Sequence, residues 1–404
     1  MAGPLTGFRV LDLSRILAGP WASQMLADLG AEVIKIERPG SGDDTRGWGP
    51  PYMPDQSGNV TSEAAYFHAA NRGKQSVCID MSQPAGQQLI QQLAAHCDVF
   101  IENFKVGGLK KYGLDYESME RINPELVYCS ITGFGQSGPY AERAGYDFMI
   151  QAMGGMMSVT GEAGGQPMKI GVALADVLTG LYASNAIQAA LIHRQNSGAG
   201  QYIDMALLDV QVATLANQAM NFLASGVSPQ RRGNSHPNIV PYQAFQTGDG
   251  HIILAIGNDA QFERFCKLAG RGELAADARF RSNSDRVRYR DALVPQVATI
   301  MLQKSSAEWL ETLNAEGIPC GPINNIEQVF ADPQVQHRGL QLELDHPDAG
   351  KVASVANPIK MSLTPVEYDR APPLLGQHTD EVLTRLLGMD AQEVSRLKQD
   401  NIID

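Results

Sequence analysis

Short apolar runs alternate with amphipathic segments through the first half of the chain. Continuous apolar runs bounded by turn residues are typical of strands buried on both faces of a parallel sheet. The segments between them repeat apolar positions at helical spacing, which predicts helices. Expected strands span residues 9–14, 32–37, 76–80, 98–101, 126–131 and 201–205, and expected helices span 20–29, 86–95 and 207–223. This alternation predicts an α/β fold in which a Rossmann-like parallel sheet carries helices on both faces.

The composition changes at residues 226–237, which are rich in glycine, proline, serine and arginine. Such a segment is typical of a linker, so we expect a second, smaller α+β unit to begin there. The elements expected after the linker are a strand at 251–256 and helices at 260–268, 286–302, 307–315 and 379–387. We expect the second unit to close near residues 318–323 and a C-terminal tail to follow it.

The overall composition is that of an ordinary folded protein, because 44% of the 404 residues are hydrophobic and 19% are charged. The formal net charge of -12 disfavours nucleic acid as a partner. No apolar run approaches the roughly 18 residues of a membrane helix, and the first residues lack the pattern of a secretory signal. We expect a cytoplasmic protein with reduced thiols, since no Cys-x-x-Cys pair occurs among Cys78, Cys97, Cys129, Cys266 and Cys320.

Polar and basic residues flank the expected strands in four loops, at residues 15–18, at Arg38, at 71–74 and at 102–105. Open α/β sheets bind ligands at the carboxyl ends of their strands, so these loops together predict a site for an anionic, nucleotide-like ligand. The chain has no glycine-rich dinucleotide motif after its first strand and no P-loop, which disfavours NAD and ATP. The turn-rich segment 39–51 is long enough to be a binding loop.

Asp176 is the one charged residue in the largely apolar run 171–183. Apolar residues recur at helical spacing beyond it, so Asp176 is expected near the start of a buried helix. Aspartate is common in the first turn of helices, where it accepts hydrogen bonds from backbone amides. A poorly solvated carboxylate there could also attack an activated acyl group. This stretch alone favours the capping role and leaves the nucleophile as the alternative.

Motifs along almost the whole chain resemble those of the class III coenzyme A transferases. The matching stretches are residues 17–20, 29–40, 42–46, 102–104, 130–135, the segment around Asp176, and 374–379. The resemblance implies that Asp176 is a nucleophile that attacks an acyl-CoA thioester. A mixed anhydride and an aspartyl-CoA thioester would follow before CoA passes to an acceptor acid. Since one thioester replaces another, no ATP, metal or tightly bound cofactor is expected, and CoA is the carried group.

The resemblance also implies which residues contact CoA. The corresponding positions are Leu17, Ala18, Arg38, Asn71, Lys74, Asn103, Phe104, Lys105, Lys111, Gly133 and Phe134. Basic side chains among them are suited to bind the CoA phosphates. Family members that act on formate and oxalate carry a glutamine where this chain has Leu17, together with a run of glycines that this chain lacks. These departures disfavour very small acids.

Other stretches resemble the family members that use dicarboxylic acids. They are residues 43–46, 48–51, 143–147, 239–245 and 321–325. We therefore expect succinyl-CoA as the donor and a C4–C6 dicarboxylic acid such as glutarate as the acceptor. The distal carboxylate of such an acid needs a cation, because an unpaired buried charge is costly. Candidate substrate contacts are Arg15, Arg46, Tyr146, Lys169 and Arg232.

Members of the family form interlocked homodimers. By the same resemblance, a large CoA-binding domain would comprise residues 1–225 and 326–404, and a small domain would comprise 226–325. One alternative is an α-methylacyl-CoA racemase, although racemases carry a histidine base where this chain has Tyr146, and tyrosine is ordinarily protonated at neutral pH. The other is a CoA-binding protein without activity, to which the Asp176 carboxylate would bring no advantage.

Overall fold

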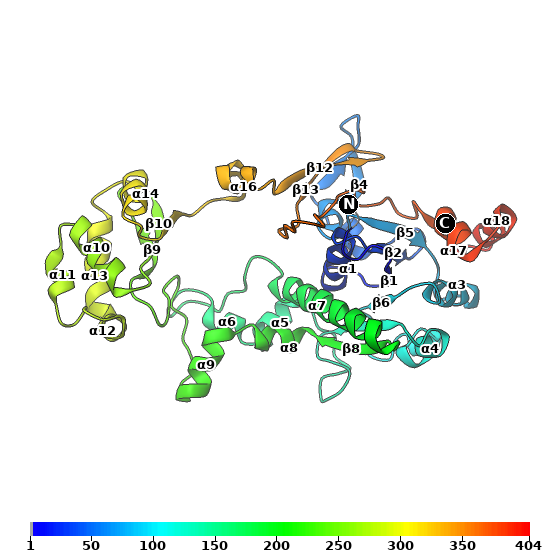
Figure 1. Ribbon diagram of the computed structural model, residues 1–404, viewed down its shortest axis with the longest axis horizontal. Helices are drawn as coiled ribbons and strands as arrows, with labels where there is room; N and C mark the ends of the chain where they lie inside the picture. The colour runs from blue at the N-terminus through cyan, green and yellow to red at the C-terminus, as the bar shows by residue number, and fades with distance from the viewer. Residues whose placement is uncertain (1–2) are drawn as a thin grey trace. The chain divides into compact units, whose positions relative to one another are not determined.

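Six parallel strands form the central sheet of the computed structural model, which describes residues 3–404 (Figure 1). The strands are β1 (Arg9–Asp12), β2 (Glu32–Glu37), β5 (Lys74–Cys78), β6 (Val99–Glu102), β7 (Val127–Thr132) and β8 (Gln201–Ala206). They lie in the order β5, β2, β1, β6, β7, β8, and every neighbouring pair is parallel. The predicted α/β fold with a parallel sheet is confirmed. The chain winds outward from β1 in both directions, so the topological switch point lies between β1 and β6.

Helices on the two faces of the sheet enclose two separate hydrophobic cores. One core contains residues of α1 (Ala18–Asp28) and α7 (Leu174–Ser197). The other contains residues of α3 (Pro84–Ala94), α4 (Tyr116–Ile122), α17 (Thr379–Leu387) and α18 (Ala391–Gln399). Within β1, Val10 belongs to the first core and Leu11 to the second, as the period of two along a strand requires. Burial on both faces explains why these strands read as continuous apolar runs.

Shorter elements complete the part of the chain around the sheet. They are η1 (Asp44–Gly47), the hairpin of β3 (Tyr52–Pro54) and β4 (Val60–Ala64), α2 (Ala65–His68), η2 (Lys110–Tyr112), α5 (Asp147–Met153), α8 (Leu207–Ala213), α16 (Pro333–His337) and the hairpin of β12 (Gln341–His346) and β13 (Gly350–Val355). The boundary with a second compact unit falls within α6 (Met156–Val159) and α9 (Ala216–Ser225). The continuous helix expected over 207–223 is wrong, because Ala216 has a φ of 47° and a left-handed residue interrupts a right-handed helix. Within residues 3–404, no helix is long and apolar enough to cross a membrane.

A second compact unit comprises residues 157–169 and 220–333, and the first comprises 3–156, 170–219 and 334–404. The second unit has its own antiparallel sheet of β9 (Tyr242–Gln246), β10 (His251–Ala255) and β11 (Cys320–Pro322). Its helices are α10 (Asp259–Leu268), α11 (Gly272–Ala276), α12 (Asn283–Arg288), α13 (Arg290–Met301), α14 (Ser306–Ala315) and α15 (Ile326–Ala331). A core that includes the buried Trp309 holds this sheet and its helices together.

Residues 157–169 belong to the second unit, although the sequence pattern predicted them in the large domain. Two hydrogen bonds connect this segment to the stretch that was expected to be a linker. The Gly233 amide donates to the Gly161 carbonyl at 2.9 Å, and Arg231 Nη2 donates to the Gly165 carbonyl at 2.7 Å. These contacts join residues that are far apart in sequence, and a local pattern does not reveal them.

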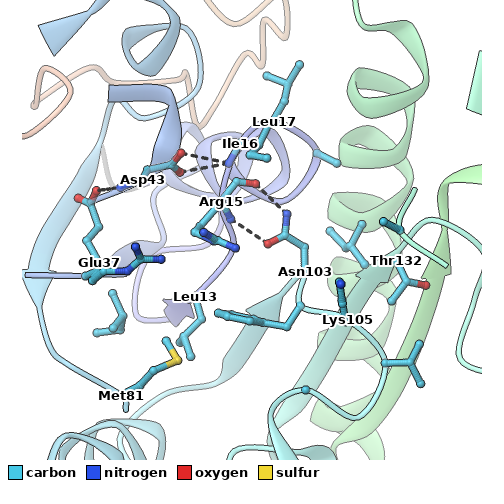
Figure 2. A pocket seen from close by; sticks show the side chains of 18 of the residues that line it. Leu13, Arg15, Ile16, Leu17, Glu37, Asp43, Met81, Asn103, Lys105 and Thr132 are labelled. Atoms are coloured by element: carbon cyan, nitrogen blue, oxygen red, sulfur yellow. Dashed lines mark hydrogen bonds between the residues drawn. The ribbon is translucent and has the colours of Figure 1, made fainter. Parts of the chain in front are cut away.

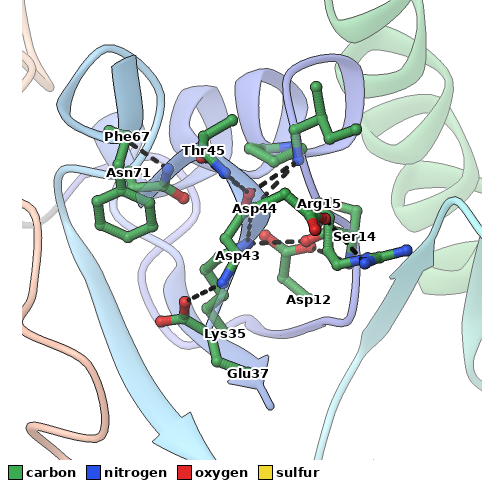
Figure 3. A network of polar contacts seen from close by, with 12 residues as sticks. Asp12, Ser14, Arg15, Lys35, Glu37, Asp43, Asp44, Thr45, Phe67 and Asn71 are labelled. Atoms are coloured by element: carbon green, nitrogen blue, oxygen red, sulfur yellow. Dashed lines mark hydrogen bonds and ion pairs between the residues drawn. The ribbon is translucent and has the colours of Figure 1, made fainter. Parts of the chain in front are cut away.

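A network of buried charges lies near the ends of β1 and β2 (Figure 3). The side chains of Lys35, Asp43, Asp12 and Lys74 are fully buried. Lys35 Nζ lies 2.9 Å from Asp43 Oδ2 and donates a hydrogen bond of 2.7 Å to the Ser14 carbonyl. Lys74 Nζ lies 3.3 Å from Asp12 Oδ2. Buried charges are costly unless they are paired, so each member of the network depends on its partner.

Replacing Lys35 with methionine would leave the buried Asp43 carboxylate without its cation. We expect this variant to lose about 3–5 kcal/mol of unfolding free energy, the usual cost of breaking a buried pair. Asp44→Asn is the matched control, since the Arg15–Asp44 pair next to it is well exposed and its loss should cost about 0–1 kcal/mol. Urea unfolding followed by circular dichroism measures both changes. Similar losses in the two variants would contradict the structural role of Lys35.

Candidate active site

A cavity of about 830 Å³ lies at the carboxyl ends of β1, β2, β6 and β7 (Figure 2). Leu13, Arg38, Asn103 and Thr132 line it, each at or just beyond the end of a different strand. This is the position at which parallel α/β sheets bind ligands, and it includes the switch point between β1 and β6. The cavity therefore has the place and the size expected of a binding site for a small molecule.

Most of the residues proposed from sequence meet in this one cavity. Those that line it are Arg15, Leu17, Ala18, Arg38, Asn103, Phe104, Lys105, Lys111, Gly133, Tyr146 and Asp176. They come from loops that are distant in sequence. The sheet brings them together because the loops follow the same ends of parallel strands, or begin the helices α1, α5 and α7.

Four other proposed residues of the first unit do not line the cavity. Asn71 and Lys74 are buried, and Lys74 Nζ donates to Asn71 Oδ1 at 2.9 Å and to the Pro20 carbonyl at 3.0 Å. Phe134 packs edge-on against Tyr140 with ring centroids 5.6 Å apart. Arg46 is held by carboxylates of β2 and β4, as described below. Lys169 and Arg232 belong to the second unit.

The guanidinium of Arg46 is fully engaged within the protein. Its Nη2 lies 2.7 Å from Glu37 Oε1 and its Nη1 lies 2.6 Å from Glu63 Oε1. Its central carbon lies 3.7 Å from the centroid of the Phe67 ring. Arg46 is only 6% exposed, so the middle of the predicted binding loop 39–51 folds inward. Pro39, which begins that loop, does line the cavity.

Four exposed basic side chains line the cavity without an ion pair among the described residues: Arg38, Lys105, Lys111 and Arg143, the last of which lies over the Tyr140 ring. Arg15 differs from them, because its Nη1 lies 2.8 Å from Asp44 Oδ2. Unpaired cations around a cavity are suited to bind phosphate groups through charge-assisted hydrogen bonds. The cavity wall can thus accept an anionic ligand without first breaking an internal ion pair.

Asp176 is the third residue of α7 and is partly buried in the cavity wall. Burial, followed by the nearby negative charge of Asp147, raises the pKa of its carboxyl group to about 7. Near neutral pH the group therefore changes between the acid and the carboxylate. A carboxylate with this pKa is a stronger base and nucleophile than an ordinary one.

Asp147, the first residue of α5, supplies the cap of α7. Its Oδ1 accepts a hydrogen bond of 2.8 Å from the Ala175 amide and one of 3.4 Å from the Asp176 amide. The N-cap residue Ala173 offers no side-chain acceptor. The capping role that the sequence suggested for Asp176 thus belongs to Asp147, which was not among the proposed site residues. An aspartate after Tyr146 at a helix start is the one sequence signal for it, and that signal does not reveal its partner.

A close backbone contact places the segment before α5. A Cβ atom on Gly133, just beyond β7, would lie 2.5 Å from the Gly145 Cα, so neither position can carry a side chain without a shift of the main chain. The next residues are Tyr146, whose side chain is 63% exposed, and Asp147. The contact therefore fixes the entry of α5, and with it the cap of α7, against the end of the sheet.

Comparisons with known proteins agree with this geometry. The model of CoA-transferase family III matches residues 5–379. Among relatives, the chain is 55% identical over 383 residues to the succinate–glutarate CoA-transferase of Agrobacterium fabrum, covering 95% of this chain and 96% of that protein. It is 44% identical over 401 residues to the human succinyl-CoA:glutarate CoA-transferase, covering 99% of this chain and 90% of that protein.

A solved structure extends the comparison to three dimensions. The crystal structure of a CAIB/BAIF family protein from Brucella suis is 52% identical and superposes with a TM-score of 0.84, covering 96% of this chain and 100% of that one. The family match spans nearly the whole sequence and the relatives are similar at full length. The protein belongs to CoA-transferase family III.

Proposed function

We propose that this CoA-transferase moves CoA from succinyl-CoA to a C4–C6 dicarboxylic acid such as glutarate, with Asp176 as the nucleophile. The two relatives described above carry succinate and glutarate in their names. The observation that carries the proposal is the state of Asp176. Among the cavity-lining carboxylates of residues 3–404, which are Glu37, Asp43, Asp80 and Asp176, its oxygens alone accept no hydrogen bond within the chain. A carboxylate without internal partners is available to react.

In the first half-reaction, an Asp176 oxygen attacks the thioester carbonyl carbon of succinyl-CoA. The carbon–sulfur bond breaks, the CoA thiolate leaves and a mixed anhydride forms. The thiolate then attacks the Asp176 carbonyl carbon of that anhydride. Succinate departs, and CoA remains on Asp176 as a thioester.

In the second half-reaction, a carboxylate of the acceptor acid attacks the aspartyl thioester and displaces the thiolate. The thiolate attacks the acceptor carbonyl of the new anhydride, which yields the product thioester and restores the Asp176 carboxylate. One thioester forms for each one that is broken, so the free-energy change is small and no ATP is consumed.

The basic residues divide between binding and structure in this proposal. Arg38, Lys105 and Lys111 bind the phosphates of CoA, since they face the cavity and have no internal ion pair. Lys74 and Asn71 instead support the strand ends from inside the protein, where they hydrogen-bond to each other. A mutation of Lys74 would thus lower the stability of the fold rather than remove a direct contact with CoA.

Arg15 is the remaining cation from the proposed substrate contacts that lines the cavity. We propose that it receives the distal carboxylate of the acid in exchange for Asp44, because that pair is exposed and therefore weak. Tyr146, exposed at the start of α5, lies in the same wall and offers a hydroxyl to the substrate.

An interlocked homodimer is part of the proposal. Within the first unit, α5 and α7 expose the large apolar side chains of Phe148, Met149, Leu181, Tyr182 and Ile192. Apolar surface of this extent on soluble helices is typical of an interface. We expect a mass near twice 43.7 kDa in light scattering at micromolar concentration, and a monomer would contradict the dimer.

Asp176→Asn should abolish CoA transfer, since a carboxamide cannot form the anhydride. We expect at least a thousandfold loss of kcat, with CoA binding retained, and no covalent CoA adduct in mass spectra after incubation with succinyl-CoA. Asp209→Asn is the matched control, because Asp209 occupies the same position in the first turn of α8 and is exposed. Near-parent activity of Asp176→Asn would exclude the mechanism. Exchange of the α-proton of a 2-methylacyl-CoA without any acceptor acid would point to a racemase.

The pH dependence should follow the ionisation of Asp176, whose pKa is raised to about 7 by burial and by Asp147. Only the carboxylate attacks, so kcat/KM for succinyl-CoA should fall about tenfold for each pH unit below 7 and level off above it. Asp147→Asn keeps an oxygen for the Ala175 amide but removes the negative charge, so its midpoint should move to lower pH. Steady-state rates measured from about pH 5 to 9 test both statements. A midpoint that is unchanged in Asp147→Asn would contradict the electrostatic role of Asp147.

A further inference from the structure

Ile16 has a left-handed backbone, with a φ of 72°. It lies in the loop between β1 and α1 and lines the cavity. A branched side chain is disfavoured in this conformation, because its Cβ crowds the adjacent carbonyl group. Such a residue persists only where its surroundings enforce it, and enforced conformations of this kind concentrate at functional sites.

Two side chains enforce the backbone conformation at Ile16 (Figure 2). The Ile16 amide donates to both carboxylate oxygens of Asp43 at 3.2 Å. The preceding residue is held on both sides by Asn103. Its amide donates to Asn103 Oδ1 at 2.9 Å, and its carbonyl accepts from Asn103 Nδ2 at 2.7 Å. The oxygen and the nitrogen of the Asn103 side-chain amide thus both bind the Arg15 backbone. The Arg15 amide, the Arg15 carbonyl and the Ile16 amide therefore all have fixed partners.

Asp43 is itself held rigidly (Figure 3). One oxygen lies 2.9 Å from Lys35 Nζ, and the other accepts from the Thr45 amide at 3.0 Å and the Thr45 hydroxyl at 2.8 Å. The Asp43 amide donates to Glu37 Oε2 at 2.9 Å. Lys35, followed by hydrogen bonds from Thr45, brings the pKa of Asp43 to about 2 against the opposing effect of burial. The carboxylate that accepts from the Ile16 amide is therefore ionised at neutral pH.

The rigid backbone at Ile16 fixes the position of the residues that follow it. Leu17 and Ala18 are buried and line the cavity, and α1 begins at Ala18. A Cβ atom on Gly180 of α7 would lie 2.8 Å from the Ala18 carbonyl oxygen, so the start of α1 is in tight contact with α7, the helix that carries Asp176. A change of the backbone at Ile16 would shift one side of the cavity relative to the nucleophile.

We propose that Asp43, oriented by Lys35, is a positioning residue for CoA transfer that acts by holding Ile16 in its left-handed conformation. This inference rests on the proposed function, because its kinetic readout is CoA transfer. It concerns the action of Asp43 through the Ile16 backbone amide, which donates to its carboxylate. For CoA transfer, the hydrogen bonds from the Ile16 amide to Asp43 would be dispensable if residue 16 could adopt the same conformation without them.

Glycine at position 16 provides the test, since glycine adopts a positive φ without steric cost. We expect Asp43→Ala, which removes both oxygens that accept from the Ile16 amide, to lower kcat/KM for succinyl-CoA at least tenfold in the parent chain. In the Ile16→Gly background, the same substitution should lower it less than threefold. Equal losses in the two backgrounds, or a loss below threefold in the parent chain, would overturn the proposal. A merely structural role of Asp43 would not be relieved by a change at position 16.

Ile16→Ala is the control for removal of the side chain. Alanine retains the Cβ that crowds the left-handed backbone, so Ile16→Gly should unfold at a higher urea concentration than Ile16→Ala. This comparison needs no activity and applies even if Asp43→Ala does not fold. Equal midpoints would overturn the proposal. A parent protein without CoA transfer to any dicarboxylic acid would refute the proposed function, while the urea comparison would still decide whether Ile16 is strained.

Discussion

The buried pair of Lys35 and Asp43 is the constraint on which the candidate site depends. Burial lowers the pKa of Lys35, but the carboxylates of Asp43, Asp12 and Glu37 more than compensate and raise it above its ordinary value. The ammonium therefore remains charged, and so does Asp43. A fixed charge pair at the carboxyl ends of β1 and β2 sets the direction in which the loops leave the sheet. One of these loops begins α1 and the other contains η1. The shape of the cavity follows from both.

Two lysines that the sequence assigned to CoA binding, Lys74 and Lys105, have different roles in the structure. The sequence predicted both Lys74 and Lys105 in loops that contact CoA, but in the structure Lys74 is the first residue of β5. Lys74 is fully buried, where desolvation lowers its pKa to about 7, whereas Lys105 is exposed at the cavity. Loop position predicts that a basic residue lies near the strand ends, but not whether it points inward or outward. That outcome depends on whether a buried acid such as Asp12 is within reach, and the acid belongs to another strand.

The sheet could be predicted because its signal is local. Each apolar run is a strand by itself, and parallel burial leaves little ambiguity in a segment such as 126–131. The interruption at Ala216 and the association of residues 157–169 with the second unit could not be predicted in this way. Alanine is a good helix former, so its left-handed backbone leaves no mark in the composition. The hydrogen bonds of residues 157–169 go to partners far along the chain. Tertiary contacts decide both features.

The cap of α7 comes from a residue outside the segment that contains Asp176. A carboxylate that capped α7 would accept amide hydrogen bonds, which would lower its pKa and occupy the lone pairs that a nucleophile needs. Asp147 accepts those hydrogen bonds instead and adds a negative charge nearby. Asp176 thus remains at the start of the helix without the hydrogen bonds that would weaken it as a nucleophile. An apolar run with one aspartate cannot indicate this division of roles, because the capping oxygen comes from a different helix.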